Sequence, residues 1–442
     1  MLDAIGVGDV SDLFAEIPAG ARFERDLRVP GPYSEIENLA YFKTLAGKNA
    51  NLEDYTCFLG GGIYDHYVPE VVSHIVSRSE FYTSYTPYQP EVSQGMLQAI
   101  FEYQSLICQL TGMEVSNASM YDGATALAEA AIMACDETGR DEIVVSRAVH
   151  PAYRQVLQTY TAGMGFNIIE APITEGLTNA EALAKIVTSS TGAVILQQPN
   201  FFGSVESAKE IGEIAKAGGA MFVVSADPIS LGLLKAPADH GADIVTAEGQ
   251  ALGIHSAFGG PLLGIFATKK KYIWRLPGRL VGATTDTQGR RGYVLTLQTR
   301  EQHIRREHAT SNICTNQSLM AVAAAVYLSA MGKNGLREVA DLCFRKAQYA
   351  YSQLITIPGI ESPWSAPFFK EFAIKTTYPI GELQQELLDN GILGGLPLGA
   401  DYPEYPDCLL FAVTEKRTRE EIDHLVEVIK TYVRRQTGTA DI

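Results

Sequence analysis

Between residues 96 and 330, short apolar runs alternate with segments of helix length, and this alternation limits the folds that are open to the chain. Runs such as "EIVVS" (142–146), "AVILQQ" (193–198) and "MFVVSA" (221–226) are apolar at successive positions, so both of their faces are apolar. Strands of that kind lie in mostly parallel sheets that helices cover on both sides. The sequence therefore predicts an α/β domain, with any ligand at the carboxyl ends of its strands.

Three regions of the chain differ in pattern. Residues 1–95 hold short amphipathic helical stretches and turns, which indicate an N-terminal arm with interface segments. Residues 96–334 form the large domain, including an irregular stretch at 277–316 that is typical of a functional or interface loop. Residues 335–442 combine a long helix with short strands and are interpreted as a smaller C-terminal α+β domain.

The charge and the cysteines exclude several classes of protein. The formal net charge is −16, which argues against a nucleic-acid surface and against binding to anionic lipid. No apolar run reaches the roughly 18 residues of a membrane span, and the N-terminus lacks a basic region before an apolar core. The six cysteines form no CxxC pair, so no metal site is expected. A cytoplasmic protein is the simplest interpretation.

Three positions at predicted strand ends carry residues suited to a flat, phosphorylated ligand. Gly123 begins a helix whose free amides suit a phosphate, although a tight turn would also need glycine. His150 could stack on a ring, or it could cap a helix or lie on the surface. Asp227 would need a cationic partner if buried, such as a protonated ring nitrogen, or it could be a helix N-cap before Pro228.

This order of a phosphate loop, a ring-stacking residue and an acidic strand end resembles that of pyridoxal-phosphate enzymes. In the aspartate-aminotransferase-like fold (PLP fold type I), a lysine that forms a Schiff base follows the next strand. Here that stretch, "ADIVTAEGQALGIHSAFGGPLLG" (242–264), contains no lysine. The nearest are Lys269 to Lys271, in a hydrophilic run where a solvated turn is expected. Without an amine nucleophile, the chain is not expected to hold the cofactor covalently.

Several long motifs resemble one family over essentially the whole chain. They are "FLGGGIYDHYVP" (58–69), "FYTSYTPYQPEVSQG" (81–95), "NASMYDGATALAEA" (117–130) and "LTLQTREQHIRREHATSNICTNQ" (295–317). These motifs are similar to subunit 1, the alpha subunit, of the two-subunit glycine decarboxylase, which is the P-protein of the glycine cleavage system. In that family the cofactor lysine follows a histidine, and the matching position here falls near Gln250.

The resemblance implies a fold, an activity and partners. The fold would be an aspartate-aminotransferase-like large domain with an N-terminal helical arm and a smaller C-terminal domain. The partner, glycine decarboxylase subunit 2, would bind pyridoxal phosphate covalently, in an assembly expected to be alpha2beta2. Glycine would be decarboxylated there, and its aminomethyl group would pass to the lipoyl arm of the H-protein.

In such a fold the active site lies between two chains, so segments of this chain are expected to reach the partner's site. The residues expected to line the glycine and lipoyl pocket are Tyr85, Thr86, Tyr88 and Gln89. Those expected to contact the partner's cofactor are Thr310, Ser311, Asn312 and Thr315. Arginines expected to bind a carboxylate, a phosphate or the H-protein are Arg300, Arg305 and Arg306. The alternatives are a packed arm for the tyrosines and a solvated helix face for the arginines.

Gly60 to Gly62 are expected to let the backbone approach a cofactor and substrate that the neighbouring subunit holds. Two other functions remain open from the residues alone. The chain could be an independent pyridoxal-phosphate decarboxylase or aminotransferase with an unexpected lysine. It could also be a catalytically silent scaffold that stabilises its partner.

Overall fold

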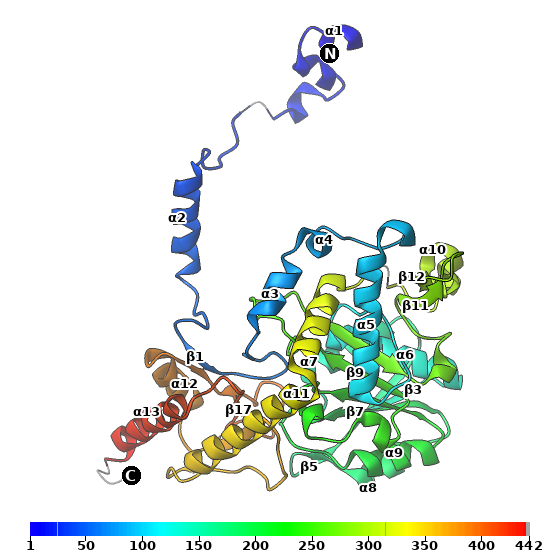
Figure 1. Cartoon of the computed structure of the whole chain (residues 1–442). Helices are drawn as coiled ribbons and strands as arrows, with labels where there is room; N and C mark the ends of the chain where they lie inside the picture. Colours follow the sequence, from blue (N-terminus) through cyan, green and yellow to red (C-terminus); the bar gives the residue numbers. More distant parts are fainter. Residues whose placement is uncertain (24, 314, 439–442) are drawn as a thin grey trace. The chain divides into compact units, whose positions relative to one another are not determined.

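The computed structural model describes residues 1–23, 25–313 and 315–438, and it divides into two compact units, Met1–Asn51 and Leu52–Ile442 (Figure 1). The first unit contains α1 (Leu2–Ile5), α2 (Glu35–Ala46) and 3-10 turns at Val10–Phe14 and Ala19–Ala21. None of its described residues, 1–23 and 25–51, is buried, so this part of the chain has no core of its own.

Residues 52–95, expected in the arm, belong to the second unit. There β1 (Thr56–Phe58) pairs in parallel with β15 (Ile392–Gly394), and α3 (Glu70–Val76) packs on α11 (Ser318–Leu354). This pairing joins two stretches that lie far apart in the sequence, which local patterns do not reveal.

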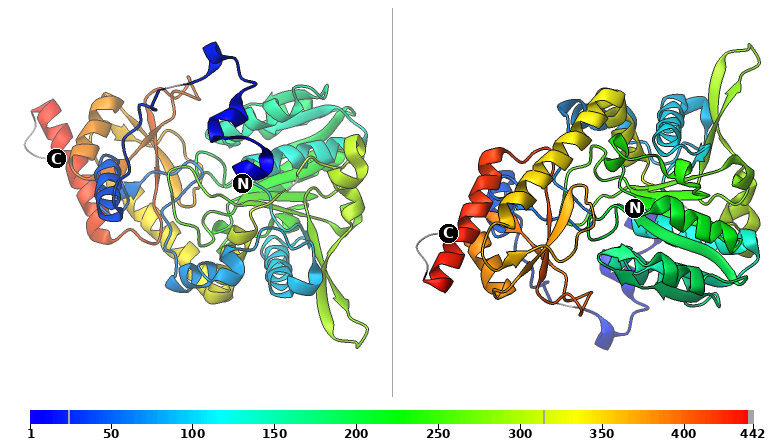
Figure 2. Two further views of the ribbon diagram at one scale, coloured as in Figure 1. Left: turned by 90° about the horizontal axis from the view of Figure 1, so that it is seen from above. Right: turned by 90° about the horizontal axis from the view of Figure 1, so that it is seen from below.

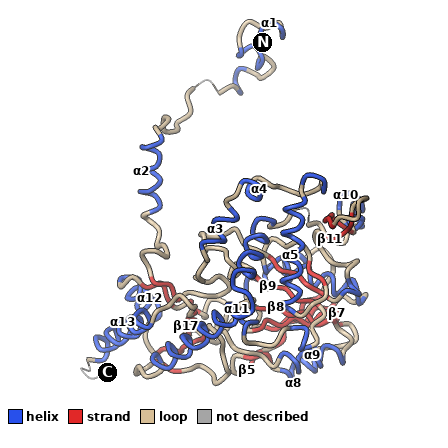
Figure 3. Tube along the Cα trace, viewed as in Figure 1, coloured by secondary structure: helices blue, strands red, loops and turns tan. Residues whose placement is uncertain are grey.

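The second unit is built on a seven-stranded sheet with the order β2-β10-β9-β8-β7-β3-β4. Strands are red in Figure 3, where β7, β8 and β9 are labelled. Its strands are β2 (Val115–Ser116), β3 (Glu142–Ser146), β4 (Asn167–Ala171), β7 (Thr191–Gln198), β8 (Met221–Ala226), β9 (Ile244–Glu248) and β10 (Gly264–Thr268). β4, β3, β7, β8 and β9 run parallel, whereas β10 is antiparallel to both of its neighbours. The predicted, mostly parallel sheet is thereby confirmed.

Helices cover both faces of this sheet because its strands are apolar on both sides. Ile143 and Val145 of β3 pack with α6 (Gly123–Thr138) and α7 (Pro151–Thr161). Val144 lies in the core on the opposite face. That face is covered by α5 (Gln94–Thr111), α8 (Ala180–Ile186), α9 (Ala208–Ala217) and the first half of α11.

The C-terminal part has a second, antiparallel sheet with a core of its own. Its strands, in order, are β13 (Ile360–Glu361), β14 (Glu371–Thr376), β17 (Cys408–Ala412) and β16 (Leu396–Pro397). Helices α12 (Ile380–Asp389), α13 (Arg419–Thr437) and the end of α11 pack on it. The proposed domain boundary at residue 334 falls inside α11, two residues after its kink at Gly332.

The stretch 277–316 is more regular than the sequence indicated. β11 (Leu280–Thr285) and β12 (Arg291–Thr296) form an antiparallel hairpin that extends outward from the body, yellow-green in Figure 2. The expectation of a wholly irregular loop was therefore wrong. The remaining short elements are α4 (Ser79–Tyr82), β5 (Ile173–Thr174), β6 (Leu177–Thr178), α10 (Gln302–Arg305) and 3-10 turns at Pro90–Val92, Ser230–Gly232, Pro237–His240, Lys270–Tyr272, Gln298–Arg300 and Arg306–His308.

By length and composition, α11 is a helix that could cross a membrane. Its residues Ala321, Ala324 and Tyr327 are buried in the protein core against the sheet. An apolar core helix has the same composition as a membrane span, so this packing accounts for it.

Candidate functional site

The predicted positions His150 and Asp227 meet at the carboxyl ends of the parallel strands, and Gly123 lies beside them at the start of α6. His150 and Asp227 line a small cavity of about 40 Å³, here called the carboxyl-end pocket. Its lining includes Gly62, Tyr64, His150, Tyr153, Gln197, Asp227, Glu248, Lys370 and Glu371. The cavity therefore lies at the carboxyl ends of the strands, where open α/β sheets bind their ligands, and its use as a ligand site stays a prediction.

The amide of Gly123, expected to bind phosphate, donates instead to this chain's own Glu248, at 2.9 Å from Oε2. Glu248 Oε1 also accepts from the backbone amides of Gln250 (2.9 Å) and Leu263 (3.0 Å). Burial raises the pKa of Glu248 to about 7, although these three N–H groups favour the carboxylate. A methyl group on Gly123 would lie 2.5 Å from the Tyr153 hydroxyl, so only glycine fits there.

His150 caps α7, and its ring lies between other groups of the chain. Its Nδ1 accepts from the amide of Ala152 (3.1 Å), so Nε2 carries the proton and donates to the carbonyl of Gly61 (2.6 Å). The ring stacks on Tyr153, with centroids 4.8 Å apart. Burial lowers the pKa of His150, so the ring is neutral at neutral pH. His150 therefore caps a helix, as one of the sequence alternatives proposed, and its ring stacks on Tyr153 of the same chain.

Asp227 has both of the roles that the sequence left open. Oδ1 accepts from the amide of Ile229 at 2.9 Å, as an N-cap residue would. Oδ2 pairs at 2.7 Å with Nζ of Lys370, whose side chain is 1% exposed. Lys370 Nζ also lies 3.5 Å from the centroid of the Tyr64 ring and 3.1 Å from His66 Nε2. The cation that Asp227 needs thus comes from the C-terminal part of the same chain.

The glycine run contacts this pocket. The amide of Gly61 donates to Glu371 Oε1 at 2.7 Å, and the Tyr64 hydroxyl donates to Oε2 at 2.8 Å. Gly61 and Gly62 have φ values of +76° and +109°, and a methyl group on Gly60 would lie 2.2 Å from Glu371 Oε1. The expectation that these glycines face a ligand on a neighbouring subunit is corrected, because they face side chains of their own chain.

Gln250, near the expected lysine position, is buried and fully engaged with the backbone. Its Oε1 accepts from the amide of Tyr64 (3.1 Å), and its Nε2 donates to the carbonyls of Tyr64 (3.1 Å) and Ile254 (2.7 Å). Lys269, one of the nearest lysines in sequence, pairs with Asp243 at 2.6 Å at the other end of β9. No primary amine of that run therefore reaches the pocket.

Pyridoxal phosphate does not fit this pocket. A cavity of about 40 Å³ holds a few water molecules, whereas pockets for cofactors of this size span roughly 300–1,000 Å³. Glu248 occupies the helix terminus that a phosphate would need, and Lys370 occupies the partner position of Asp227.

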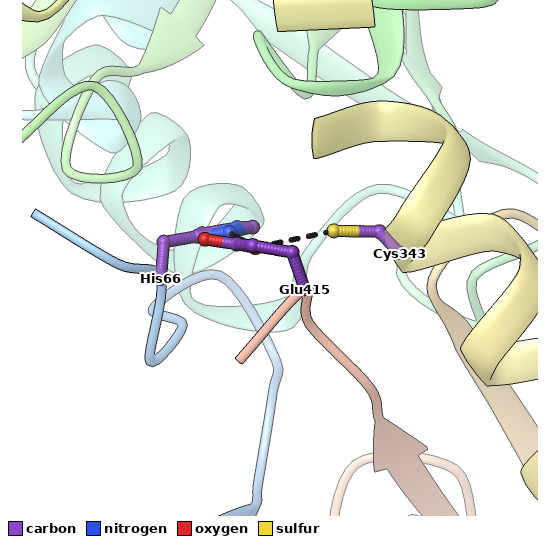
Figure 4. A group of neighbouring side chains, drawn as sticks. All are labelled: His66, Cys343 and Glu415. Carbon is purple, nitrogen blue, oxygen red and sulfur yellow. Dashed lines mark hydrogen bonds and ion pairs between the residues drawn. The ribbon is translucent and has the colours of Figure 1, made fainter. Parts of the chain in front are cut away.

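Next to the pocket, His66, Cys343 and Glu415 come together from three distant segments (Figure 4). His66 Nδ1 lies 2.7 Å from Glu415 Oε2, and the Cys343 thiol donates to the same oxygen at 3.4 Å. Burial alone would raise the pKa of Glu415, but the hydrogen bond and charge of His66 lower it to about 2. Ligand atoms 2.7 Å apart are too close to share a tetrahedral metal ion, and Lys370 adds a cation beside His66. The geometry is that of a hydrogen-bonded network.

The tyrosine segment lies apart from the carboxyl-end pocket and is partly open to solvent. The four residues expected there are Tyr85, Thr86, Tyr88 and Gln89. Tyr85 is 76% exposed and Tyr88 is 50% exposed. Arg279 donates from Nη2 to the Tyr88 hydroxyl (2.8 Å) and from Nη1 to Asn316 Oδ1 (3.3 Å). One guanidinium thereby links the tyrosine segment to the segment that follows Thr315.

The residues expected to contact the partner's cofactor are Thr310, Ser311, Asn312 and Thr315, and Asn312 is exposed. Ser311 hydrogen-bonds to the buried Glu129 of α6, whose pKa burial raises to about 7. The amide of Thr310 donates to the carbonyl of Arg300 at 3.2 Å. These contacts attach the segment to the large domain. Cys314 lies outside the described residues.

Arg300 has a structural role, unlike the one expected for it. Its guanidinium is buried and donates to the carbonyls of Leu276 and Gly278. Burial lowers the pKa of Arg300, and the side chain is unavailable to an outside anion. Arg305 and Arg306 are exposed.

The charged and hydroxyl groups of the pocket that sequence reasoning missed include Tyr64, Glu248, Lys370 and Glu371. Glu248 directly follows the apolar run of β9, so an acid at a strand end was a signal that could have been used. Lys370 and Glu371 lie more than 100 residues beyond Ala251 and the earlier pocket residues, so no local pattern pointed to them.

Comparisons with known proteins agree with one another. A family model described as "Glycine cleavage system P-protein" matches residues 1–429. A "Probable glycine dehydrogenase (decarboxylating) subunit 1" from Desulforamulus reducens is 54% identical over 96% of this chain and 95% of its own. A protein of the same name from Carboxydothermus hydrogenoformans is 53% identical over 97% of this chain and 96% of its own.

Solved structures show the same relationship. The crystal structure of glycine decarboxylase (P-protein) of the glycine cleavage system, in inhibitor-bound form, has a TM-score of 0.90 at 44% identity, covering 98% of this chain and 97% of that chain. A cysteine desulfurase from Escherichia coli has a TM-score of 0.63 at 15% identity, covering 87% and 96%. This second likeness concerns the fold alone, which is PLP fold type I as expected.

Proposed function

The chain belongs to the glycine cleavage system P-protein family, and from this premise we propose that it is the glycine decarboxylase subunit that holds no cofactor of its own. It completes an active site whose pyridoxal phosphate is bound covalently by a second subunit. When bound, pyridoxal phosphate accepts the electrons left on the carbon that loses CO2. The contribution of this chain is to orient the reactants and exclude water.

The filled carboxyl-end pocket is the observation that carries this proposal. At about 40 Å³ it has no room for the cofactor, Gln250 lies near the expected position of the lysine, and the amine of Lys370 in the pocket is paired with Asp227. A contribution of this chain to the reaction therefore has to come from residues that lie outside the pocket and remain exposed.

The tyrosine segment has the properties needed for such a surface. Tyr85 presents most of its ring to solvent, and Tyr88 is oriented by Arg279. Aromatic side chains provide rigid walls with a polar tip, which suit a site that holds glycine and then an extended lipoyl arm. Thr86 and Gln89 add a hydroxyl and an amide to the same surface.

The segment with Thr310, Ser311, Asn312 and Thr315 supplies hydroxyl and amide groups and directly precedes Asn316, which accepts a hydrogen bond from Arg279. Such groups bind phosphate oxygens without adding charge. We assign them to the phosphate of the partner's cofactor, and we assign the exposed Arg305 and Arg306 to an acidic partner such as the lipoylated H-protein.

A second subunit is implied by the names of the relatives. We further propose that the assembly is alpha2beta2, that glycine and the H-protein are its substrates and that it acts in the cytoplasm. The assembly is tested by analytical ultracentrifugation of this chain with and without the second subunit. A mass that does not change on mixing would contradict it.

An independent pyridoxal-phosphate enzyme is the alternative that the pocket argues against. The purified chain is mixed with pyridoxal phosphate, followed by absorbance, and then treated with borohydride. We expect no absorbance band of a bound cofactor and no labelled lysine. A label on Lys370, the lysine in the pocket, or on any other lysine would overturn the assignment.

A silent scaffold is tested by substitution at the exposed surface. We predict that Tyr85→Ala and Asn312→Ala, each reconstituted with the second subunit, reduce activity about tenfold or more, because misplaced reactants lose rate steeply. Tyr82→Ala is the matched control, since Tyr82 is also exposed, at 69%, and lies outside the proposed surface. Normal assembly with full activity in both site variants would favour the scaffold.

A further inference from the structure

We propose that this chain fills its own cofactor pocket, with Glu248 in the place of a cofactor phosphate and Lys370 in the place of a cofactor ring nitrogen. These internal contacts then fasten the C-terminal sheet to the central sheet, as a bound ligand would. The inference concerns the stability and ligand exclusion of this chain, and it holds whichever reaction the assembled protein performs.

The phosphate place is identified by its donors. Glu248 accepts three backbone N–H groups, one of them from Gly123 at the N-terminus of a 16-residue helix. A helix terminus with free amides attracts an anion, and a carboxylate satisfies the same donors that phosphate oxygens would. Glu248 comes from the end of β9, so the anion is part of the sheet that the helix covers.

The ring-nitrogen place is identified by Asp227. A strand-end aspartate in this fold requires a cation, and Lys370 Nζ supplies it at 2.7 Å. The Tyr64 ring lies 3.5 Å from the same nitrogen, so a cation–π contact also stabilises the ammonium in a position without solvent. Since Lys370 directly precedes β14, this one pair ties the C-terminal sheet to the end of β8.

Gln250 is the third residue that helps to fill the pocket. Its two hydrogen bonds to the backbone of Tyr64 hold the segment from Gly60 to His66 across the pocket. Glu371 binds the same segment through Gly61 and the Tyr64 hydroxyl. The segment is therefore held from the central sheet and from β14 at the same time.

The phosphate place is tested by removing its carboxylate. Glu248→Ala is compared with Glu248→Gln and the wild-type chain by thermal unfolding in inorganic phosphate and in sodium chloride of equal ionic strength. We expect the Tm of Glu248→Ala to fall and then to rise by a few degrees in phosphate alone. The wild-type chain and the isosteric Glu248→Gln should not respond. A folded Glu248→Ala without a phosphate response, or an equal response of all three proteins, would overturn this part.

The ring-nitrogen place is tested by a double-mutant cycle in the full chain. Lys370→Met leaves Asp227 buried without its cation and should lower Tm by about 5 °C or more. Asp227→Asn in the same chain should recover part of that loss, because it removes the unpaired charge. Strictly additive changes would show that the two groups do not act as a pair. This cycle stands even if Glu248→Ala fails to fold.

Ligand exclusion is tested by Gln250→Lys alone. Since the phosphate and ring places remain filled, we expect this variant to take up no pyridoxal phosphate, read by absorbance and by borohydride labelling. A label at position 250 would mean that the pocket is open and would overturn the proposal. The family assignment does not depend on this outcome, so the two can fail separately.

Discussion

At Gly60 the backbone passes so close to Glu371 that one added methyl group would lie 2.2 Å from the carboxylate and 2.7 Å from Cβ of Ala412. Neither neighbour can retreat, because Glu371 is held by Gly61 and Tyr64. Close packing of this kind makes single-residue changes costly even when the residue carries no functional group.

We predict that Gly60→Ala destabilises the chain by about 1–3 kcal/mol, the usual range for overpacking a tight site. The measurement is the urea midpoint of unfolding. Gly163→Ala is the control, because a methyl group there meets no atom within 4 Å and the backbone φ is not positive. Equal midpoints for the two variants would contradict the packing argument.

The sequence located some residues of the site and not others, for a physical reason. His150 and Asp227 were predictable because they follow β3 and β8, and parallel strands end at one edge, whereas Gln250 was located only through the family resemblance. The partners of these residues, Lys370 and Gly61, are brought in by contacts that span long stretches of chain. Hydrophobic periodicity in the sequence does not reveal such long-range contacts, so the side chains that fill the pocket could not be predicted from it.

At the scale of elements, α11 is divided by a kink at Gly332 into two helical segments. There φ is +56° and ψ is −175°, a conformation that residues with a Cβ rarely adopt. Residues of α11 as far as Cys343 pack in the core of the central sheet, and those from Ala347 to Leu354 pack with the C-terminal sheet. The kink therefore lies within the stretch that packs on the central sheet, where it redirects the helix before its last turns reach the second core.

We predict that Gly332→Ala destabilises the chain by about 1–2 kcal/mol through backbone strain alone, since a methyl group there meets no atom. Gly381→Ala in α12 is the matched control: it is also exposed and free of neighbours, but its φ is not positive. That change should stabilise by a few tenths of a kcal/mol. Denaturation curves give the change in unfolding free energy for each variant, which should be negative for Gly332→Ala and positive for Gly381→Ala. Changes of the same sign would refute the explanation by backbone strain.

The β11–β12 hairpin lies in the stretch that the sequence pattern wrongly predicted to be an irregular loop. Its strands, "LVGATT" and "RGYVLT", mix glycine and threonine with few large apolar residues, and that composition resembles a loop. Only Tyr293 and Leu295 of β12 are buried, against α5 and β11. With so little of the hairpin in the core, its hydrophobic alternation is weak, and the ladder between the two strands supplies the order instead.

At the scale of the whole molecule, the buried carboxyls make stability depend on pH. Burial raises the pKa of Glu371 from 4.5 to about 7, so the folded chain holds this proton more tightly than the unfolded chain. Its contribution to stability is therefore full below pH 4.5 and is lost as the pH rises to about 7. Glu415 acts in the opposite direction and in another window, because its pKa is lowered to about 2.

We predict that Glu371→Gln flattens the decline of unfolding free energy between pH 4.5 and 7, where the wild-type chain loses up to about 3 kcal/mol from this group. Glutamine keeps an acceptor for Gly61 and does not titrate. Urea unfolding at several pH values gives the slopes. Glu415→Gln should leave this window unchanged and alter only the acid limb below pH 4.5. Parallel plots of unfolding free energy against pH for the wild-type chain and Glu371→Gln would show that Glu371 does not cause the decline.

The hydrogen bonds between Gln250 and the backbone of Tyr64 also bear on evolutionary reversibility. A lineage that regained a lysine at this position would lose both bonds and gain no cofactor, because Glu248 and Lys370 still occupy the space. Removing Lys370 and Glu248 first would break one buried ion pair and leave three backbone amides without an acceptor. Each of these substitutions is unfavourable until the others have been made, so a return to cofactor binding would pass through destabilised intermediates. Such coupling would keep the two subunits functionally distinct, one with the cofactor and one without it, long after their sequences had diverged.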